Sequence, residues 1–586
     1  MKRILAILLL GACAVRPPES VVVPVSSRPA VSGTAQRVVL LTCDGLGADA
    51  YASEPIAELE AMPLRVERVI PVAPTSSAST HATIITGVPP DRHGVVANRF
   101  HIRGTPPSKD VHGLDTELTA ETIVDAARRA GKRVGVIAFP TFDAKSERRR
   151  GDWGVAWSHP VTEPRRIELT IADFRSDWMP PGWGASAPRR RSFSPTLRAR
   201  IAWTVPRRAQ KDVDLVAYDT TDDRSRNYDA LYLEVEGREE RLAAGQWFQV
   251  STQLPDGLYG SWSKLLRFDP KLASVVVYWG AISRTEAYPP SFQEVVDRHA
   301  GFWPGNPDGS GGDAIYVEQA TRLSAFLARA TETAIERMPF DLLLAYQPIA
   351  DQIEHSFAGS LPQRKTAHAA LGSAIATIAR SLDAEKDALV VTGDHGVGAI
   401  DTEVRINALL ASRGLTKLSG GSVADDTRWA AYASGNVAHL YRFAPPDDAS
   451  RIVKLLTELR APDGRPVFER VEVRTPLHHP NSGDVIAIAH PGFALTPGPG
   501  EIFTTVSGRG QHGGLPTHPV FHTLLRATGA GVTPQTVRTM QQTEVARFVA
   551  ELLGMRFPAS VVLHKYRPLG ATTKGKIFMK HYTSGR

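Results

Sequence analysis

Six side chains of metal-binding type stand where strand ends or glycine-rich loops would present them. Asp44 follows an apolar run at 37–43 and precedes a glycine. Asp351 and His355 are four residues apart, which places a carboxylate and an imidazole on one side of a helical turn. Flanking glycines would let the backbone approach an ion closely at the other three positions. These are Asp394 and His395, which end another apolar run, and His512 in a Gly-Arg-Gly-Gln-His-Gly-Gly stretch.

The number and type of these side chains indicate two metal ions. Three carboxylates and three imidazoles are more ligands than one tetrahedral ion accepts. Mixed Asp and His ligation is typical of zinc, so we expect two zinc ions, with other divalent ions not excluded. Two ions close together can hold both the attacking and the leaving oxygen of a phosphoryl displacement.

A hydroxyl-rich segment at 74–86 supplies candidates for a nucleophile at the start of a helix expected over 79–86. A helix N-terminus offers free N–H groups and the positive end of the helix dipole. Both suit a phosphate group and a hydroxyl whose pKa is lowered near metal. The candidate nucleophiles are Ser76, Ser77 and Ser79.

The candidate ligands belong to a series of short motifs in a defined order. The series is Asp44-Gly45, Pro74-Thr75 through His81, Thr86-Gly87, His93-Gly94, Asn98, then DxxxH at Asp351, DHG at Asp394 and GxHG at Gly510. Over roughly 37–160 and 314–554, this ordered set resembles the nucleotide pyrophosphatase/phosphodiesterase family of the alkaline phosphatase superfamily. The resemblance implies a hydrolase of phosphoric ester or pyrophosphate bonds.

The resemblance also implies a role for each matching residue. Ser77 matches the family nucleophile, on which a phospho-serine would form and which would contact a metal. Asn98 matches the Asn that helps to bind a non-bridging phosphate oxygen. The ion that activates the nucleophile would be held by Asp44, Asp394 and His395, and the second ion by Asp351, His355 and His512.

Two residues depart from the family pattern. Ser77 stands where the family usually has Thr, and Ser79-Thr80 stand where it usually has Pro-Asn. If the register slips, Ser76 or Ser79 is the nucleophile instead. Counting back from His81 favours Ser77.

The substrate depends on contacts to the phosphate oxygens. A monoester carries about one more negative charge, and enzymes that cleave monoesters tend to add Lys or Arg contacts. Lys145 and Arg148 are candidates for such substrate binding, although a solvated loop is the favoured interpretation. We therefore expect a phosphodiesterase or nucleotide pyrophosphatase acting on small phosphate esters or nucleotides, with a phosphomonoesterase as the alternative. The alternative from another class is an inactive lipoprotein binding module, which predicts lost metal ligands, and all six are present.

Alternating apolar and amphipathic segments predict the scaffold that positions these residues. Strands are expected at 37–43, 133–139, 340–346, 388–394 and 484–490, and helices at 119–130, 317–337, 365–382 and 543–553. This alternation predicts an α/β fold of the alkaline phosphatase type, with a central, mostly parallel sheet and helices on both faces. Sites in such folds lie beyond the carboxyl ends of the strands, where the candidate ligands follow.

A stretch rich in Trp, Pro and Arg interrupts the alternation and reads as antiparallel β structure. We expect a β-rich insertion or lid there. The expected division of the chain is a signal peptide (1–12), a lipidated cysteine and tether (13–36), a catalytic core in three parts (37–162, 308–418 and 501–560), the insertion (163–307), a smaller elaboration (419–500) and a basic C-terminal tail (561–586).

The N-terminus predicts export. Lys2 and Arg3 precede a short apolar run, and the following Leu-Gly-Ala-Cys resembles a bacterial lipobox in which Cys13 is lipidated. We expect a cell-envelope protein held in the membrane by this lipid, most simply an outer-membrane lipoprotein facing the periplasm. Cys43 then has no partner for a disulfide within the mature chain. The net charge of +7 includes isolated basic clusters at 148–150 and 189–191, and we expect solvated faces to account for most of that charge. Because no nucleic-acid-binding motif is present, no stable nucleic-acid complex is expected.

Overall fold

The computed structural model describes residues 28–176, 192–446 and 449–557. The predicted signal peptide, Cys13, most of the tether, the cluster at 189–191 and the basic tail lie outside the described residues. Among the described residues, no helix is both long and apolar enough to cross a membrane.

A nine-stranded sheet forms the centre of the molecule. Its order is β16 (Glu286–Tyr288), β6 (Trp153–Ala156), β5 (Val134–Ile137), β17 (Leu342–Gln347), β1 (Arg37–Cys43), β18 (Asp387–Gly393), β28 (Thr523–Gly529), β2 (Leu64–Ile70) and β29 (Gln535–Gln541). Within it, β16 and β28 run against the other strands. The predicted mostly parallel sheet is therefore confirmed.

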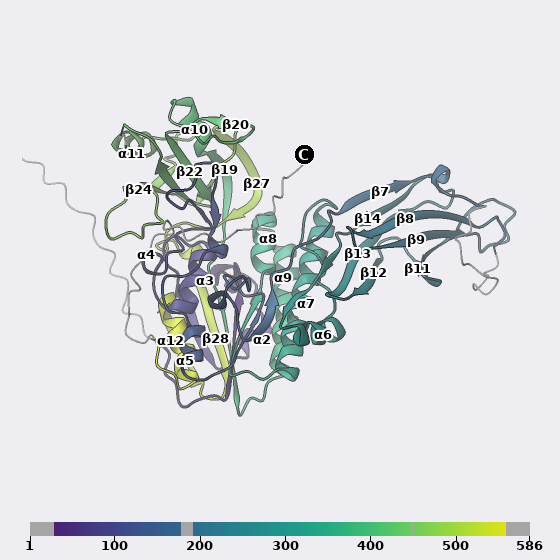
Figure 1. Ribbon diagram of the computed structural model, residues 1–586, viewed down its shortest axis with the longest axis horizontal. Coiled ribbons are helices and arrows are strands. Elements are labelled where there is room, and N and C mark those ends of the chain that lie inside the picture. The colour runs from purple at the N-terminus through teal and green to yellow at the C-terminus, as the bar shows by residue number, and fades with distance from the viewer. Residues whose placement is uncertain (1–27, 177–191, 447–448, 558–586) are drawn as a thin grey trace, which may run out of the picture.

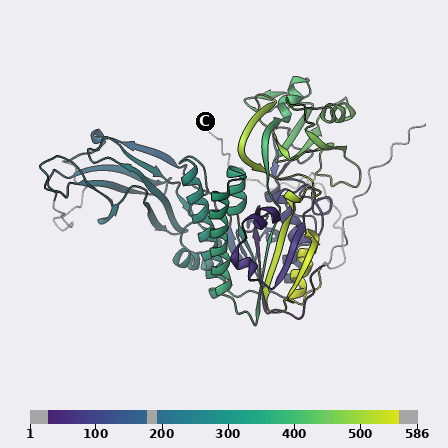
Figure 2. The ribbon, with the colours of Figure 1, turned by 180° about the vertical axis from the view of Figure 1, so that it is seen from behind.

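Helices cover both faces of this sheet, as its continuous apolar strands require. Val38 and Leu40 of β1 face one core, and Val39 and Leu41 face the other. The first face carries α3 (Ser77–Thr86), α5 (Ile123–Arg129) and α12 (Val545–Leu552). The second carries α1 (Ala48–Ser53), α2 (Ala57–Glu60), α6 (Pro290–His299), α7 (Asp313–Arg337), α8 (Ile349–Phe357) and α9 (Leu361–Arg380). Figures 1 and 2 show the two groups on opposite sides of the sheet.

Two antiparallel sheets project from the side of α6 and α7 as an arm, which we call the β arm (165–284; Figure 1). Trp203 and Phe248 are among the side chains buried between them. The chain rejoins the central sheet at β16, before residue 307. The strands of the arm are β7 (Arg165–Leu169), β8 (Leu197–Val205), β9 (Ala209–Tyr218), β10 (Ala230–Val235), β11 (Arg238–Leu242), β12 (Trp247–Leu254), β13 (Gly257–Phe268), β14 (Val275–Trp279) and β15 (Ser283–Arg284).

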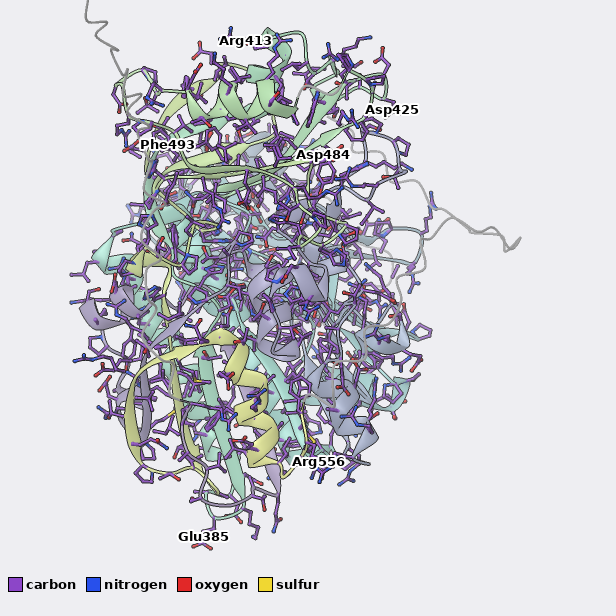
Figure 3. All side chains as sticks on the ribbon, turned by 90° about the vertical axis from the view of Figure 1, so that its left-hand side faces the viewer. Glu385, Arg413, Asp425, Asp484, Phe493 and Arg556 are labelled. Atoms are coloured by element: carbon purple, nitrogen blue, oxygen red, sulfur yellow. The ribbon has the colours of Figure 1, made fainter. Side chains whose placement is uncertain are left out.

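A second elaboration, the small lobe (398–511), stands over the carboxyl edge of the central sheet. Figure 3 shows this arrangement, with Arg413 at the far end of the lobe and Glu385, just before β18, at the opposite end of the molecule. One sheet consists of β26 (Gly492–Thr496), β19 (Gly398–Arg405) and β27 (Phe503–Gln511), and the other of β22 (Trp429–Ser434), β23 (Val437–Arg442), β25 (Val485–Ala489) and β24 (Phe468–Val473). Smaller elements are α10 (Ile406–Ser412), α11 (Ala449–Thr457), β20 (Leu418–Ser419) and β21 (Ser422–Val423).

One predicted strand has a different place from the one expected. The run at 484–490 forms β25, which pairs antiparallel with β23 and β24 in the small lobe and not with the central sheet. Its side chains are all buried, which is why its pattern matches that of a central parallel strand. Three short elements follow α3 and precede α5 along the chain: α4 (Pro90–His93), β3 (Arg99–Phe100) and β4 (Val111–His112).

Candidate active site

The six predicted ligands form two neighbouring groups beyond the carboxyl edge of the central sheet. Asp44 follows β1, Asp394 and His395 follow β18, Asp351 and His355 lie on α8 after β17, and His512 follows β27. The ligand atoms of Asp44, Asp394 and His395 lie within 4.8 Å of one another, and so do those of Asp351, His355 and His512. The order of the motifs along the chain therefore corresponds to two clusters in space.

Gly45 allows the two groups to approach each other. Its φ is +70°, a conformation that residues with a Cβ adopt rarely, and a Cβ on it would lie 2.6 Å from the Cα of Asp351. At this point the backbone N–H of Asp351 donates to the carbonyl of Asp44 at 2.9 Å. The Asp-Gly pair thus joins β1 to the start of α8 and brings a carboxylate of each group together.

The group of Asp44, Asp394 and His395 is buried. The Nε2 of His395 lies 3.1 Å from Asp394 Oδ2 and 3.5 Å from Asp44 Oδ1. The other Asp394 oxygen accepts the N–H of Gly45 at 3.0 Å, and Tyr346 donates its hydroxyl to Asp44 Oδ2 at 2.7 Å. Burial, followed by repulsion from Asp394 and Asp351, raises the pKa of Asp44 well above its usual value. The cluster therefore holds more negative charge than its protein neighbours balance.

The group of Asp351, His355 and His512 is more open. His355 is 28% exposed and Asp351 17%, whereas Asp394 and His395 are fully buried. The Nδ1 atoms of His355 and His512 lie 2.8 Å and 3.1 Å from the carbonyls of Gly510 and Thr75, an arrangement in which each donates and leaves Nε2 free to bind an ion. Burial alone would raise the pKa of Asp351, but the neighbouring His355 lowers it to about 2.

The residues of both groups fit divalent cations. Among the described residues, Asp44 Oδ1, Asp351 Oδ1 and His395 Nδ1 are buried without a hydrogen-bond partner. Buried carboxylate oxygens without partners are costly, and a bound cation would satisfy both of them. The donor set of carboxylate oxygens and imidazole nitrogens is one that zinc accepts.

Among the three candidate serines, Ser77, the first residue of α3, has a hydroxyl that reaches the buried group. Its Oγ lies 3.0 Å from His395 Nε2. Thr80, one turn along the helix, donates its hydroxyl to Asp394 Oδ2 at 3.0 Å. The hydroxyls of Ser76 and Ser79 are buried without hydrogen-bond partners among the described residues, and neither is recorded in contact with the ligands. The geometry therefore selects Ser77 among the three candidates.

Asn98 lies beside the N-terminus of α3. Its Oδ1 accepts the N–H of Ala78 at 2.8 Å, which fixes the side chain next to Ser77. No partner for its Nδ2 is recorded among the described residues, and the side chain is only half-buried. An amide N–H beside the Ser77 hydroxyl can donate to a phosphate oxygen.

The two cationic candidates have protein partners. Lys145 pairs with Asp143 at 3.0 Å and with Asp115 at 3.6 Å. Arg148 donates to the carbonyls of Leu118 at 2.9 Å and Ala120 at 3.1 Å. Neither is recorded in contact with the six ligands, Ser77 or Asn98.

The basic cluster at 148–150 is not uniformly solvated. Arg149 is only 7% exposed and pairs with Asp143 at 2.9 Å, and it also donates to carbonyls of the segment that follows β4. Solvated faces were expected for most of the basic charge, and Arg149 is an exception, because a run of three arginines does not show which of them turns inward.

Three residues at the site were not among the predicted site residues. Thr80 and Tyr346 donate their hydroxyls to the predicted ligands Asp394 and Asp44. The Nδ1 of His81 lies 2.8 Å from the Ser77 carbonyl and 3.3 Å from Asp394 Oδ2. Thr80 and His81 lie in the segment of the nucleophile, where helical spacing from Ser77 was an available signal. Tyr346 ends an apolar strand, and nothing in its local pattern sets it apart from a core tyrosine.

Comparisons with solved structures give low identities. Murine ectonucleotide pyrophosphatase/phosphodiesterase 5, as an inactive form in complex with AMP, has a TM-score of 0.48 and 13% identity, covering 89% of this chain and 96% of that chain. The human protein of the same name has a TM-score of 0.49 and 14% identity, covering 89% of this chain and 96% of that chain. Phosphonoacetate hydrolase from Sinorhizobium meliloti 1021, in complex with phosphonoformate, has a TM-score of 0.47 and 15% identity, covering 90% of this chain and 97% of that chain.

A comparison with curated proteins found no match. The family model described as "Type I phosphodiesterase / nucleotide pyrophosphatase" matches residues 38–515, which include all six ligands and Ser77. Members of this family depend on metal ions and cleave phosphoric ester or pyrophosphate bonds. This chain therefore belongs to the type I phosphodiesterase/nucleotide pyrophosphatase family and is a hydrolase of that kind.

Proposed function

We propose that the protein is a phosphodiesterase or nucleotide pyrophosphatase that acts through a phospho-serine on Ser77 at a site for two zinc ions. The observation that carries the proposal is the position of the Ser77 hydroxyl, 3.0 Å from His395 Nε2 and at the start of α3. Asp44, Asp394 and His395 would hold one ion, and Asp351, His355 and His512 the other. When bound, the ions would lower the pKa of the Ser77 hydroxyl and neutralise charge on the leaving oxygen.

The side chains of the protein then account for the remaining requirements of the reaction. The Ser77 oxygen attacks phosphorus in line as its proton is lost, and the bond from phosphorus to the leaving oxygen breaks, so that this oxygen departs as an alcohol or phosphate. The phospho-serine formed from a diester still carries the second ester group of the substrate. Water hydrolyses this ester in a second displacement and restores the serine. Asn98 Nδ2 donates to a non-bridging oxygen in both steps, while its Oδ1 stays bonded to Ala78. The N-terminus of α3 adds favourable N–H dipoles.

The surroundings of the site favour diesters over monoesters. The extra charge of a monoester calls for a free cation near the phosphate. Lys145 and Arg148 are instead engaged with Asp143 and with the carbonyls of Leu118 and Ala120. Asn98 remains as a neutral donor next to Ser77, which suits a phosphodiester, because its phosphate carries less negative charge than that of a monoester.

The test compares three substrates and one variant. The purified protein is assayed with bis(p-nitrophenyl) phosphate, the p-nitrophenyl ester of thymidine monophosphate and p-nitrophenyl phosphate, with zinc and with a chelator. We expect diester turnover that needs zinc and is lost in Ser77→Ala. Preferred monoester turnover would favour a phosphomonoesterase, and zinc binding without any turnover would favour a binding module.

We also propose that the mature protein is a lipoprotein of the bacterial cell envelope, anchored through Cys13 and facing the periplasm. The support is the order of basic residues, short apolar run and cysteine at the N-terminus. Expression of the full chain and of Cys13→Ser in a Gram-negative host tests it. The wild-type protein should fractionate with membranes and carry a lipid-sized mass increase at its N-terminus, and the variant should lose both.

A further inference from the structure

The turn of the β22–β23 hairpin brings the small lobe into contact with the metal-binding core. Ser434 pairs with Val437, which leaves Gly435 and Asn436 as a two-residue turn. The φ of Gly435 is +64°, as expected for the first central residue of a type II′ turn. The backbone N–H of Asn436 donates to the carbonyl of His512 at 2.9 Å. The lobe therefore holds the backbone of a predicted metal ligand directly.

Gly435 shows how close this approach is. A Cβ on Gly435 would lie 1.9 Å from the carbonyl oxygen of His512, which no real side chain could occupy. The glycine is needed twice, for the φ of the turn and for the space next to His512. The contact is therefore a fitted one and not an incidental meeting of two loops.

The side chain of Asn436 anchors the turn to the rest of the lobe. Asn436 is 1% exposed, and its Nδ2 donates to the carbonyl of Phe493 at 2.7 Å. The backbone carbonyl of Asn436 accepts the N–H of Ala489 at 2.8 Å, and the backbone carbonyl of Gly435 accepts the N–H of Leu495 at 2.6 Å. The position of the turn is thus set by β25 and β26.

On its other side, the His512 segment is held by Thr75, two residues before Ser77. The Nδ1 of His512 lies 3.1 Å from the Thr75 carbonyl. The N–H of Gly513 donates to the Thr75 hydroxyl at 3.1 Å, and the N–H of Thr75 donates to the carbonyl of Gly514 at 3.2 Å. The 512–514 segment is therefore clamped between the small lobe and the segment that carries the nucleophile.

We propose that Asn436 is a positioning residue that sets the affinity of the Asp351–His355–His512 site for its metal ion. The inference rests on the proposed two-metal function. Asn436 contacts neither the ligand atoms nor the nucleophile, so it acts only by fixing the backbone of His512. Groups that orient a metal ligand typically change metal affinity by about 10–100-fold when they are removed.

Asn436→Ala removes the side-chain bonds to the carbonyls of Phe493 and His490, and Asn436→Asp keeps the size but loses the donor to both. Asn407→Ala is the matched control. Asn407 is also a fully buried asparagine of the small lobe, whose Nδ2 donates to the carbonyl of Ala431 at 2.8 Å, and it has no recorded bond to the 512–514 segment. Any general loosening of the lobe should therefore appear in both alanine variants, whereas loss of positioning should appear only at 436.

Zinc affinity is measured by competition with a chromophoric chelator on the full protein, and circular dichroism checks folding. We expect two zinc ions in the wild type, with the affinity for one of them, that of the Asp351–His355–His512 site, lowered about 10-fold or more in both Asn436 variants and unchanged in Asn407→Ala. Raising free zinc should restore kcat in the Asn436 variants, because Asn436 does not touch the substrate. If the Asp351–His355–His512 site binds zinc with equal affinity in the wild type and in Asn436→Ala, or if Asn407→Ala loses as much zinc affinity as Asn436→Ala, the inference is overturned.

A measurement on the unmodified protein covers the case in which the variants do not fold. Since coupling between two sites is reciprocal, zinc at the second site should slow hydrogen exchange of the Asn436 amide, but not of the Ala431 amide, which donates to Asn407 Oδ1. Unchanged exchange at Asn436 would also overturn the inference. A wild-type protein that binds fewer than two ions would instead contradict the proposed function.

Discussion

Replacement of Asn98 separates its effect on stability from its proposed part in catalysis. Its Oδ1 accepts the N–H of Ala78 in the first turn of α3, as a capping residue would. Loss of such an acceptor costs about 1 kcal/mol in free energy of unfolding. Its Nδ2 would stabilise charge on the phosphate oxygens, and removal of a donor of this kind lowers kcat by about 10²–10³-fold. That loss corresponds to about 2.7–4 kcal/mol of transition-state stabilisation.

Two variants divide these effects. Asn98→Ala loses both the acceptor and the donor, so we expect Tm to fall by no more than ~2–4 °C and kcat/KM by about 10²–10³-fold. Asn98→Asp keeps an oxygen for the Ala78 N–H, lacks the donor and adds negative charge beside the phosphate. Its Tm should match that of the wild type, while its kcat/KM should be as low as that of Asn98→Ala or lower.

The assay is bis(p-nitrophenyl) phosphate hydrolysis at saturating zinc, with zinc content and calorimetric Tm measured on the same samples. Equal zinc content in all three proteins is the control, because it excludes loss of metal as the cause. The reasoning fails if Asn98→Asp retains kcat/KM within tenfold of the wild type, or if activity falls only in the variant that loses stability.

Three further predictions address the nucleophile, a buried histidine and the cationic loop. Ser77→Thr should keep kcat/KM within about tenfold, since a hydroxyl remains at the start of α3, whereas Ser77→Ala should give no acid-stable phospho-enzyme in quenched reactions with a labelled diester. Burial and the neighbouring His479 lower the pKa of His93 from 6.5 to about 3. Below about pH 6.5, His93 therefore binds a proton in the unfolded chain but stays neutral in the folded protein. The free energy of unfolding should consequently fall as pH decreases below about 6.5. Urea unfolding is measured at pH 7.5 and 5 on protein freed of metal by a chelator. The free energy of unfolding should decrease less between these pH values in His93→Gln than in the wild type, and an equal decrease would contradict the lowered pKa of His93. Lys145→Ala should leave the ratio of monoester to diester kcat/KM unchanged, and a drop in that ratio of tenfold or more would place Lys145 at the substrate.

The fold was predictable where a local pattern has one structural meaning. The apolar run at 37–43 ends at the polar Asp44, and β1 has those bounds. The helix expected from 119 begins only after Thr122, whose hydroxyl accepts the N–H of Asp125 as a cap. The run at 484–490 was placed in the wrong sheet, because burial on both faces gives the same pattern in β25 as in a central strand.

The candidate site was predictable to a similar extent. The residue types and their ordered motifs pointed to the two groups that the structure brings together. The contact of Tyr346 with Asp44, however, joins two residues that are 302 positions apart, and no local spacing along the chain predicts it. The same limit applies to Asn436, whose importance appears only when β25, β26 and the 512–514 segment are seen together.

The predicted ligands of each group come from distant parts of the chain, and this has a consequence for how the proposed metal sites form. The group of Asp44, Asp394 and His395 needs β1 and β18 to pair across more than three hundred residues, and the group of Asp351, His355 and His512 is complete only when residue 512 is in place. A nascent chain that ends before residue 395 therefore has neither group, and one that ends before residue 512 lacks the second. Metal loading of the two proposed sites would therefore follow folding, and the metals bound would reflect the compartment in which the chain folds.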